Sequence, residues 1–169
     1  GNSPALVAKY TWFAQSAYNM NTLTPLQNVG EGLDMALAAG ADPTNIVSGG
    51  LVAAGARNKS MDSHTGAAGC QPCVWVNKTG HRFVNEGVAE NIGDIGPYWA
   101  KQPDGLVYAL LDEADIQRLI KDGSEISIGE FVVYGRPLNQ LRAELDQDVA
   151  DGVAWKADSI EELAKQVGL

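Results

Sequence analysis

The sequence predicts a small α+β domain in which a β-hairpin and short mixed strands pack against several helices. β-branched and aromatic residues gather in short runs, of which 74–76 and 107–111 are the clearest. Elsewhere, apolar residues recur at three- and four-residue spacing after residues that favour helix starts. The chain of 169 residues is long enough to bury one core without disulfides.

The composition disfavours some classes of binding partner. Hydrophobic residues make up 45% of the chain and charged residues 20%, as in ordinary globular domains. The net charge is -9, which disfavours binding to nucleic acid or to anionic membrane surfaces. A membrane span needs a run of about 18 apolar residues, and the sequence has none. We therefore expect neither a nucleic-acid partner nor a membrane span.

The hairpin is expected at strands 73–77 and 81–85. Asn77-Lys78-Thr79-Gly80, between the two runs, is typical of a type I turn closed by a left-handed residue. Gly80 suits the closing position because it has no Cβ to penalise a positive φ.

The other elements follow from periodicity and capping residues. Helices are expected at residues 2–17, 31–39, 112–121, 137–149 and 159–167. Further strands are expected at 46–54, 107–111 and 131–134. Residues 55–72 are rich in Gly, Ser, Asn and Asp and predict a long loop, a type of segment that is often functional.

Several stretches carry a family resemblance. VNKTGHRFVNE, at 76–86, resembles the VNxxGxRFxNE hairpin of the fumarate reductase and succinate dehydrogenase flavoprotein family. GNSPALVAKY is similar to that family's GNxPxMxxxY, and GEGLDMALAAGA to its GDGxxMAxxAGA. VYALLDEADIQRL and KADSIEELAKQVGL follow in the family's order. The resemblance therefore extends over essentially the whole chain.

The resemblance implies a single cap domain at residues 46–169, preceded at 1–45 by a helical segment that connects it to a larger FAD-binding domain. In such enzymes the cap closes over flavin and a small-molecule substrate while hydride moves to or from a C–C bond. The full-length protein would be an FAD-dependent oxidoreductase. The missing FAD-binding domain of the same chain would hold most of the cofactor, so we expect no FAD on this fragment and no activity from it alone.

The resemblance also suggests site residues. Glu31, between Gly30 and Gly32, falls where the family brings an acidic residue to the FAD, whereas the pattern alone indicates only a glycine-capped helix. His64 and Thr65 fall in the interval that holds the family's substrate-binding His and Thr-Glu pair. They match by region only, because the family's HPT and TEAVRG strings are absent, and a lone His is commonly a plain loop residue. The catalytic residues therefore stay undetermined, with His64 and Thr65 as candidates.

Cys70-x-x-Cys73 suggests an alternative, a free-standing thiol-redox or small-molecule-binding module. A reactive thiol needs a lowered pKa, which a helix N-terminus can supply, but this pair leads directly into a strand. A zinc site would need both cysteines together with His64 and His81. The plainer interpretation is two small, partly buried thiols, and we expect no metal.

Charges near the hairpin bear on the substrate. Arg82 and Glu86 would share one face of the second strand, where they could form an ion pair. Family members that reduce dicarboxylates have a proton-donating Arg shortly after the Asn-Glu pair; the comparable position here is Glu90. No Arg or Lys occurs between Arg82 and Lys101. We therefore expect a substrate less anionic than fumarate, or a proton donated by a Tyr or His.

Overall fold

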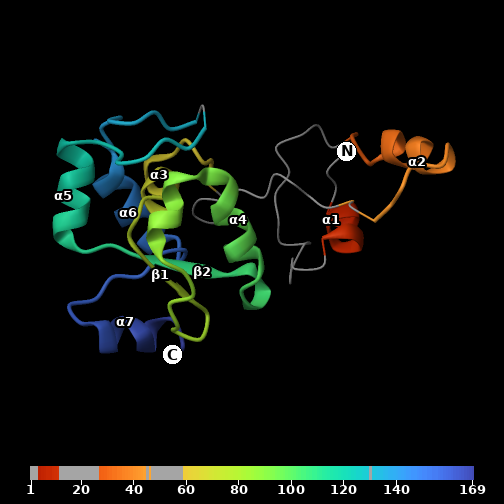
Figure 1. Cartoon of the computed structure of the whole chain (residues 1–169). Helices are drawn as coiled ribbons and strands as arrows, with labels where there is room; N and C mark the ends of the chain where they lie inside the picture. Colours follow the sequence, from red (N-terminus) through yellow and green to blue (C-terminus); the bar gives the residue numbers. More distant parts are fainter. Residues whose placement is uncertain (1–3, 12–26, 45, 47–58, 130) are drawn as a thin grey trace.

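The computed structural model describes residues 4–11, 27–44, 46, 59–129 and 131–169. Figure 1 shows two helices on one side, α1 (Pro4–Tyr10) and α2 (Glu31–Ala38), and the other elements gathered on the opposite side. These are α3 (His64–Gly69), β1 (Val74–Asn77), η2 (Glu86–Glu90), α4 (Ile92–Ala100), η3 (Pro103–Gly105), β2 (Val107–Leu110), α5 (Glu113–Lys121), α6 (Leu141–Ala150) and α7 (Ile160–Gln166). The predicted α+β class is confirmed.

The sheet consists of β1 and β2, which pair antiparallel with Trp75 opposite Ala109. The predicted strand at 107–111 is thus confirmed, and it pairs with the side of β1 opposite to the one on which the second arm of the hairpin was expected. The prediction of a strand at 81–85 is wrong, because only a single bridge joins Val76 to Arg82. The turn itself forms as expected: Gly80 has a φ of 79° and its N–H donates to the Asn77 carbonyl oxygen at 2.9 Å.

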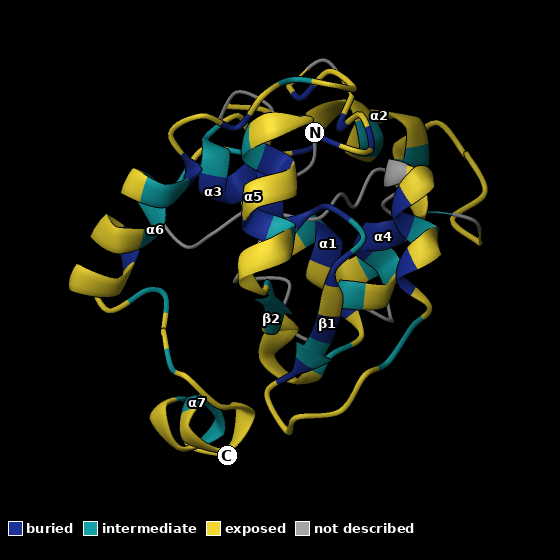
Figure 2. Ribbon diagram, turned by 90° about the vertical axis from the view of Figure 1, so that its left-hand side faces the viewer, coloured by how far each residue is buried: buried dark blue, intermediate teal, exposed yellow. Residues whose placement is uncertain are grey.

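The core lies between the sheet and the helices around it, as the dark residues of Figure 2 show. Trp75 is completely buried, and its ring meets that of Trp99 edge to face with centroids 5.4 Å apart. The Trp75 indole N–H donates to the Gly69 carbonyl oxygen at 3.1 Å, so the ring's one polar atom is satisfied. The other large aliphatic side chains that are fully buried are Ile95, Leu119, Ile128, Val132, Leu138 and Leu141.

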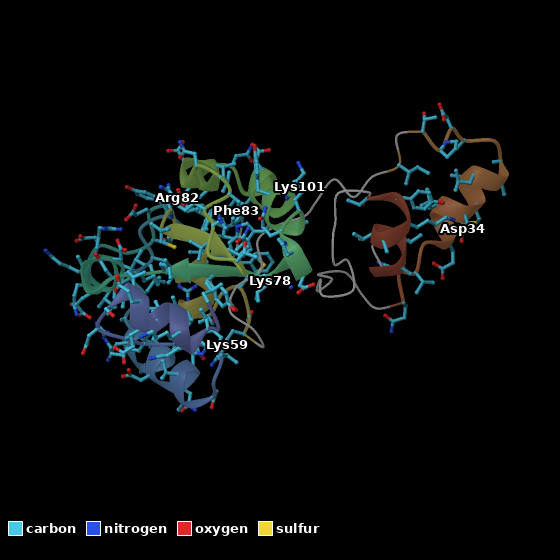
Figure 3. The ribbon with its side chains drawn as sticks, turned by 90° about the horizontal axis from the view of Figure 1, so that it is seen from below. Asp34, Lys59, Lys78, Arg82, Phe83 and Lys101 are labelled. Atoms are coloured by element: carbon cyan, nitrogen blue, oxygen red, sulfur yellow. The ribbon has the colours of Figure 1, made fainter. Side chains whose placement is uncertain are left out.

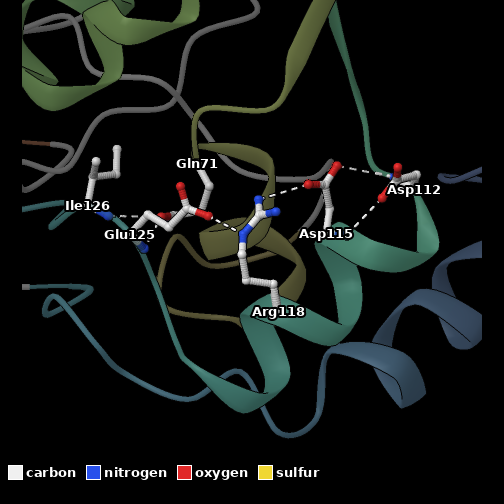
Figure 4. Close-up of polar contacts among 6 residues, drawn as sticks. All are labelled: Gln71, Asp112, Asp115, Arg118, Glu125 and Ile126. Carbon is white, nitrogen blue, oxygen red and sulfur yellow. Dashed lines mark hydrogen bonds and ion pairs between the residues drawn. The ribbon is translucent and has the colours of Figure 1, made fainter.

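Helix α5 forms where the sequence predicts it. The Asp112 side chain accepts the Asp115 N–H at 2.8 Å, and the Asp115 side chain accepts the Asp112 N–H in return. Figure 4 shows how α5 is linked to the segment that follows it: Arg118 of α5 pairs with Asp115 of the same helix and with Glu125 beyond it. Buried Gln71 accepts the N–H groups of Glu125 and Ile126 at 2.7 and 3.0 Å.

The last two helices also form, with one boundary moved. The predicted helix at 137–149 begins only at Leu141, because Leu138 is held in the core by an N–H bond to the Leu119 carbonyl oxygen at 3.1 Å. Helix α7 starts after Ser159, whose hydroxyl accepts the Glu162 N–H at 3.1 Å. None of the described helices is long and apolar enough to cross a membrane.

Two further expectations are wrong. Residues 131–134 form no strand, because their β-pairing within the described residues consists of one isolated bridge, between Ile128 and Val132. The predicted loop at 55–72 contains α3 within its described part, where the Ser63 hydroxyl caps the helix by accepting the Gly66 N–H at 3.0 Å. Residues 47–54 of the strand expected at 46–54, and residues 2–3 and 12–17 of the first predicted helix, lie outside the described residues.

Candidate functional site

The segment that carries the family-like motif wraps around the side of β1 that faces away from β2. There the Trp75 backbone N–H donates to Glu86 Oε1 at 3.1 Å. Just before Glu86, the Asn85 side chain accepts the Gly87 N–H at 3.0 Å and begins η2. The chain therefore enters the 3₁₀ helix η2 soon after the single Val76–Arg82 bridge. The Glu86 carboxylate accepts the β1 N–H that a second hairpin strand would otherwise bond.

Glu86 is a buried acid paired with an arginine. The Arg82 Nε donates to Glu86 Oε1 at 3.0 Å, and its Nη2 donates to Oε2, so the guanidinium grips both oxygens. Hydrogen bonding to Arg82 lowers the pKa of Glu86; burial opposes this, and the Trp75 N–H adds to the lowering. The expected Arg82–Glu86 ion pair is present, although it spans four residues across a turn and does not follow from strand alternation.

The Asn77 side chain holds the motif's turn. Its Oδ1 accepts the N–H groups of Thr79 and His81 at 3.0 and 3.1 Å, while its Nδ2 donates to Gln102 Oε1 at 3.2 Å. Because Gln102 lies just beyond α4, this buried amide links the turn to that helix. In the described part of the motif, Asn77, Arg82 and Glu86 thus make hydrogen bonds that stabilise the fold.

His64 and Thr65, the substrate-binding candidates, lie in the first turn of α3 against the start of α6. Thr65 donates its backbone N–H and its hydroxyl to Glu144 Oε2, at 2.9 and 3.3 Å. The Gln140 N–H donates to His64 Nδ1 at 3.3 Å. Because Nδ1 accepts this N–H, the ring proton is assigned to Nε2, and His64 as a whole is half-buried.

An ion pair between a half-buried lysine and a buried aspartate lies beside this contact. Lys59 Nζ lies 2.9 Å from Oδ1 of Asp148, whose side chain is fully buried in α6. The pKa of Lys59 is raised, chiefly by its hydrogen bond to Asp148. Lys59 and Thr65 therefore attach the start of α3 to two carboxylates one turn apart, at Glu144 and Asp148.

Gly30, Glu31 and Gly32 lie at the start of α2. Gly30 has a φ of 111°, and a Cβ there would come within 2.4 Å of Leu6 Cδ1, so glycine permits close packing of α1 on α2. Glu31 is exposed as the first residue of α2. Figure 3 shows Asp34 of α2 far from Lys59, which precedes α3. The structure thus leaves Glu31, on α2, apart from His64 and Thr65, which are neighbours in sequence on α3 (Figure 1).

Cys70 and Cys73 are both buried, and burial is the main cause that raises the pKa of each thiol to about 12. The reactive thiolate form is therefore scarce near neutral pH, which weighs against a thiol-redox module. Within the described ranges, no three or more His, Cys, Asp and Glu side chains gather so as to hold a metal ion.

Sequence reasoning missed the supporting residues of this region. Glu144 lies 79 residues from Thr65, and Gln140 lies 76 residues from His64. No local pattern signals such pairs. Ser63, by contrast, is a recognisable N-cap, and it could have indicated α3 within the predicted loop.

Comparison with known proteins gives one informative similarity. No family model and no solved structure matches the chain. The chain is 31% identical, over 180 aligned positions, to a vinyl phenol reductase from Lactiplantibacillus plantarum. The alignment covers 99% of this chain but 35% of that protein, so the chain spans about a third of its relative's length.

Proposed function

We propose that residues 46–169 are the substrate-side cap of an FAD-dependent reductase of the fumarate reductase type, and that residues 1–45 connect the cap to the FAD-binding domain. The observation that carries this is the alignment of 99% of the chain with a protein named for reducing a vinyl phenol. The motif-bearing stretches support the same family type, since they occur in its order along the whole chain.

The substrate class follows from charge. A vinyl phenol is a neutral alkene conjugated to an aromatic ring, whereas fumarate is a dianion. Arg82 is committed to Glu86, and the next cation along the chain is Lys101. Glu90 and Asp94, between them, are exposed carboxylates. A carboxylate about 4 Å from a dianion costs roughly 4 kcal/mol per charge pair at an effective dielectric constant near 20. This surface therefore suits a neutral substrate.

The chain's own residues would bind substrate, exclude water and supply a proton. FAD, when bound, supplies hydride chemistry that no side chain offers. Glu86 is a poor proton donor because its lowered pKa keeps it ionised near neutral pH. His64 is the better-placed donor of those named, since Thr65 is occupied by Glu144. To give up its Nε2 proton and become a neutral imidazole, its ring would carry a second proton on Nδ1 in place of the hydrogen bond that it accepts from Gln140. Glu31 would approach FAD from the α2 side, supported by its position between two glycines.

The test uses the full-length protein encoded by the gene, purified and assayed with a reduced viologen dye. We expect bound flavin and conversion of para-vinylphenol to para-ethylphenol, with turnover of fumarate at least 100-fold slower, as loss of a positioned acid implies (about 100-fold to 10,000-fold). Fumarate turnover of several per second would contradict the substrate class. Absence of flavin from the purified protein would contradict the proposed reaction.

A further inference from the structure

The chain between α5 and α6 presents apolar side chains to solvent. Phe131 is 38% exposed, Val133 64% and Tyr134 73%, whereas Val132 between them is fully buried. We call Phe131, Val133 and Tyr134 the apolar loop. In Figure 1 the connection from α5 to α6 runs along the outside of the molecule. Three large apolar side chains exposed within four residues form a local concentration unlike isolated surface leucines or valines.

Hydrogen bonds hold the apolar loop in this position. The Ser124 hydroxyl donates to the Val133 carbonyl oxygen at 2.7 Å, and the Tyr134 N–H donates to the Ser127 hydroxyl at 3.1 Å. The Ile128 N–H donates to the Val132 carbonyl oxygen at 2.8 Å. With Val132 anchored in the core, the backbone that carries the exposed side chains is held in place before any partner binds. Such preorganisation reduces the entropy lost on binding.

Close packing beneath the apolar loop adds to its rigidity. A Cβ placed on Gly123 would lie 2.5 Å from both the carbonyl carbon and the oxygen of Gly135. Beside Tyr134 the surface is hollowed into a shallow depression, lined also by Arg118, Asp122, Gly123, Ser124 and Glu125. Arg118 is paired with Asp115 and Glu125, while Asp122 is exposed and takes part in none of the ion pairs of the described residues.

We propose that the apolar loop docks onto another part of the same polypeptide, outside residues 1–169. This rests on the proposed function in one respect, that the chain belongs to a larger protein. The relative is about three times as long as the aligned region, so ample chain exists there to cover the surface. The partner surface would be an apolar pocket that admits Val133 and the Tyr134 ring, edged by Lys or Arg opposite Asp122. Buried aromatic residues at the centre of such a contact carry much of its energy.

The experiment is hydroxyl-radical footprinting of the full-length protein, read by mass spectrometry at each residue relative to the same protein unfolded in urea. We expect Tyr134 to be protected nearly as strongly as fully buried Trp75. Labelling of Tyr134 at its unfolded rate would overturn the proposal. Protection that disappears on dilution, together with a concentration-dependent mass in solution, would overturn it in favour of a second copy.

A matched pair of variants completes the test. Val133→Glu and Ile160→Glu place the same charge at positions with similar exposure, 64% and 66%, the second on α7. Val133→Glu should increase labelling of Tyr134 several-fold, and Ile160→Glu should leave it unchanged. Equal effects of the two variants would contradict docking at this loop. Footprinting requires no turnover, so protection without reductase activity would refute the proposed function alone, and activity without protection would refute the docking alone.

Discussion

Glu86 occupies the place of a neighbouring strand beside Trp75, because its carboxylate accepts the backbone N–H that a sheet partner would otherwise take, at 3.1 Å. The same carboxylate is gripped by Arg82. A short sequence segment thereby covers one side of a completely buried tryptophan.

Replacing Glu86 should destabilise the fold. Glu86→Ala leaves the Trp75 N–H without its acceptor and frees Arg82, and we expect a loss of about 2 to 3 kcal/mol in the free energy of unfolding. Glu86→Gln keeps an acceptor and loses mainly the pairing with exposed Arg82, which should cost about 1 kcal/mol or less. Urea unfolding measures both, with Glu90→Gln as the control because Glu90 is exposed on the same 3₁₀ helix. An unchanged midpoint for Glu86→Ala would contradict this role.

The contribution of Glu86 should depend on pH. Its pKa in the folded protein is lowered from the ordinary value of 4.5, chiefly by Arg82. The stability that ionised Glu86 provides is therefore full above pH 4.5 and is lost as pH falls through its folded pKa. The difference in unfolding free energy between wild type and Glu86→Gln should be constant near neutral pH and shrink in acid. A difference that grows on acidification would show that the sign is wrong.

The two thiols should be inert in the folded state. Burial raises the pKa of Cys70 and Cys73 from 9.0 to about 12, so iodoacetamide should modify them far more slowly in the native protein than in urea. Because the folded pKa values are raised, their protonated state contributes stability that is full below pH 9 and declines as pH rises toward 12. Thermal melts with and without reductant should nearly coincide. A large fall in melting temperature on reduction would instead reveal a structural disulfide.

Gly123 and Gly152 provide a matched comparison of backbone strain and collision. Both have positive φ, 87° and 71°, but a Cβ meets the backbone at 2.5 Å only at Gly123, whereas nothing lies within 4 Å of one at Gly152. Gly152→Ala should cost about 1 to 2 kcal/mol, the price of a left-handed residue. Gly123→Ala should cost about 1 to 3 kcal/mol more, because the chain around Gly135 must move. Similar unfolding midpoints for the two variants would argue against the collision.

The sequence predicts elements that depend on nearby residues better than it predicts contacts between distant residues. The turn at Asn77–Gly80, the α5 cap at Asp112 and the strand at 107–110 depend on nearby residues, and all three form. The pairing of β1 with Val107–Leu110 joins residues 34 positions apart, as Trp75 and Ala109 are, and a hairpin pattern cannot show it. At 131–134 the apolar run resembled a strand, yet only Val132 is buried.

In the candidate site, too, the sequence indicates local residues but not their distant contacts. The resemblance indicated His64 and Thr65, and their role in a site stays a prediction. Their contacts come from Gln140 and Glu144 at the start of α6, almost half the chain away. Gly66 and Gly69 lower the helix propensity of the six-residue α3, so the Ser63 cap and this packing help to form the helix. Tertiary contacts therefore help to decide the local structure here.

The Glu86 contact also affects how the protein behaves when it is stressed by acid. A strand with unpaired N–H groups can recruit the strand of another molecule and begin a fibril, and a side-chain carboxylate with its bulky guanidinium partner blocks such addition. Once Glu86 is protonated, its attraction to Arg82 weakens, and the edge of β1 beside Trp75 becomes more accessible to a strand of another molecule. We therefore expect Glu86, which accepts the Trp75 N–H at neutral pH, also to hinder intermolecular strand pairing.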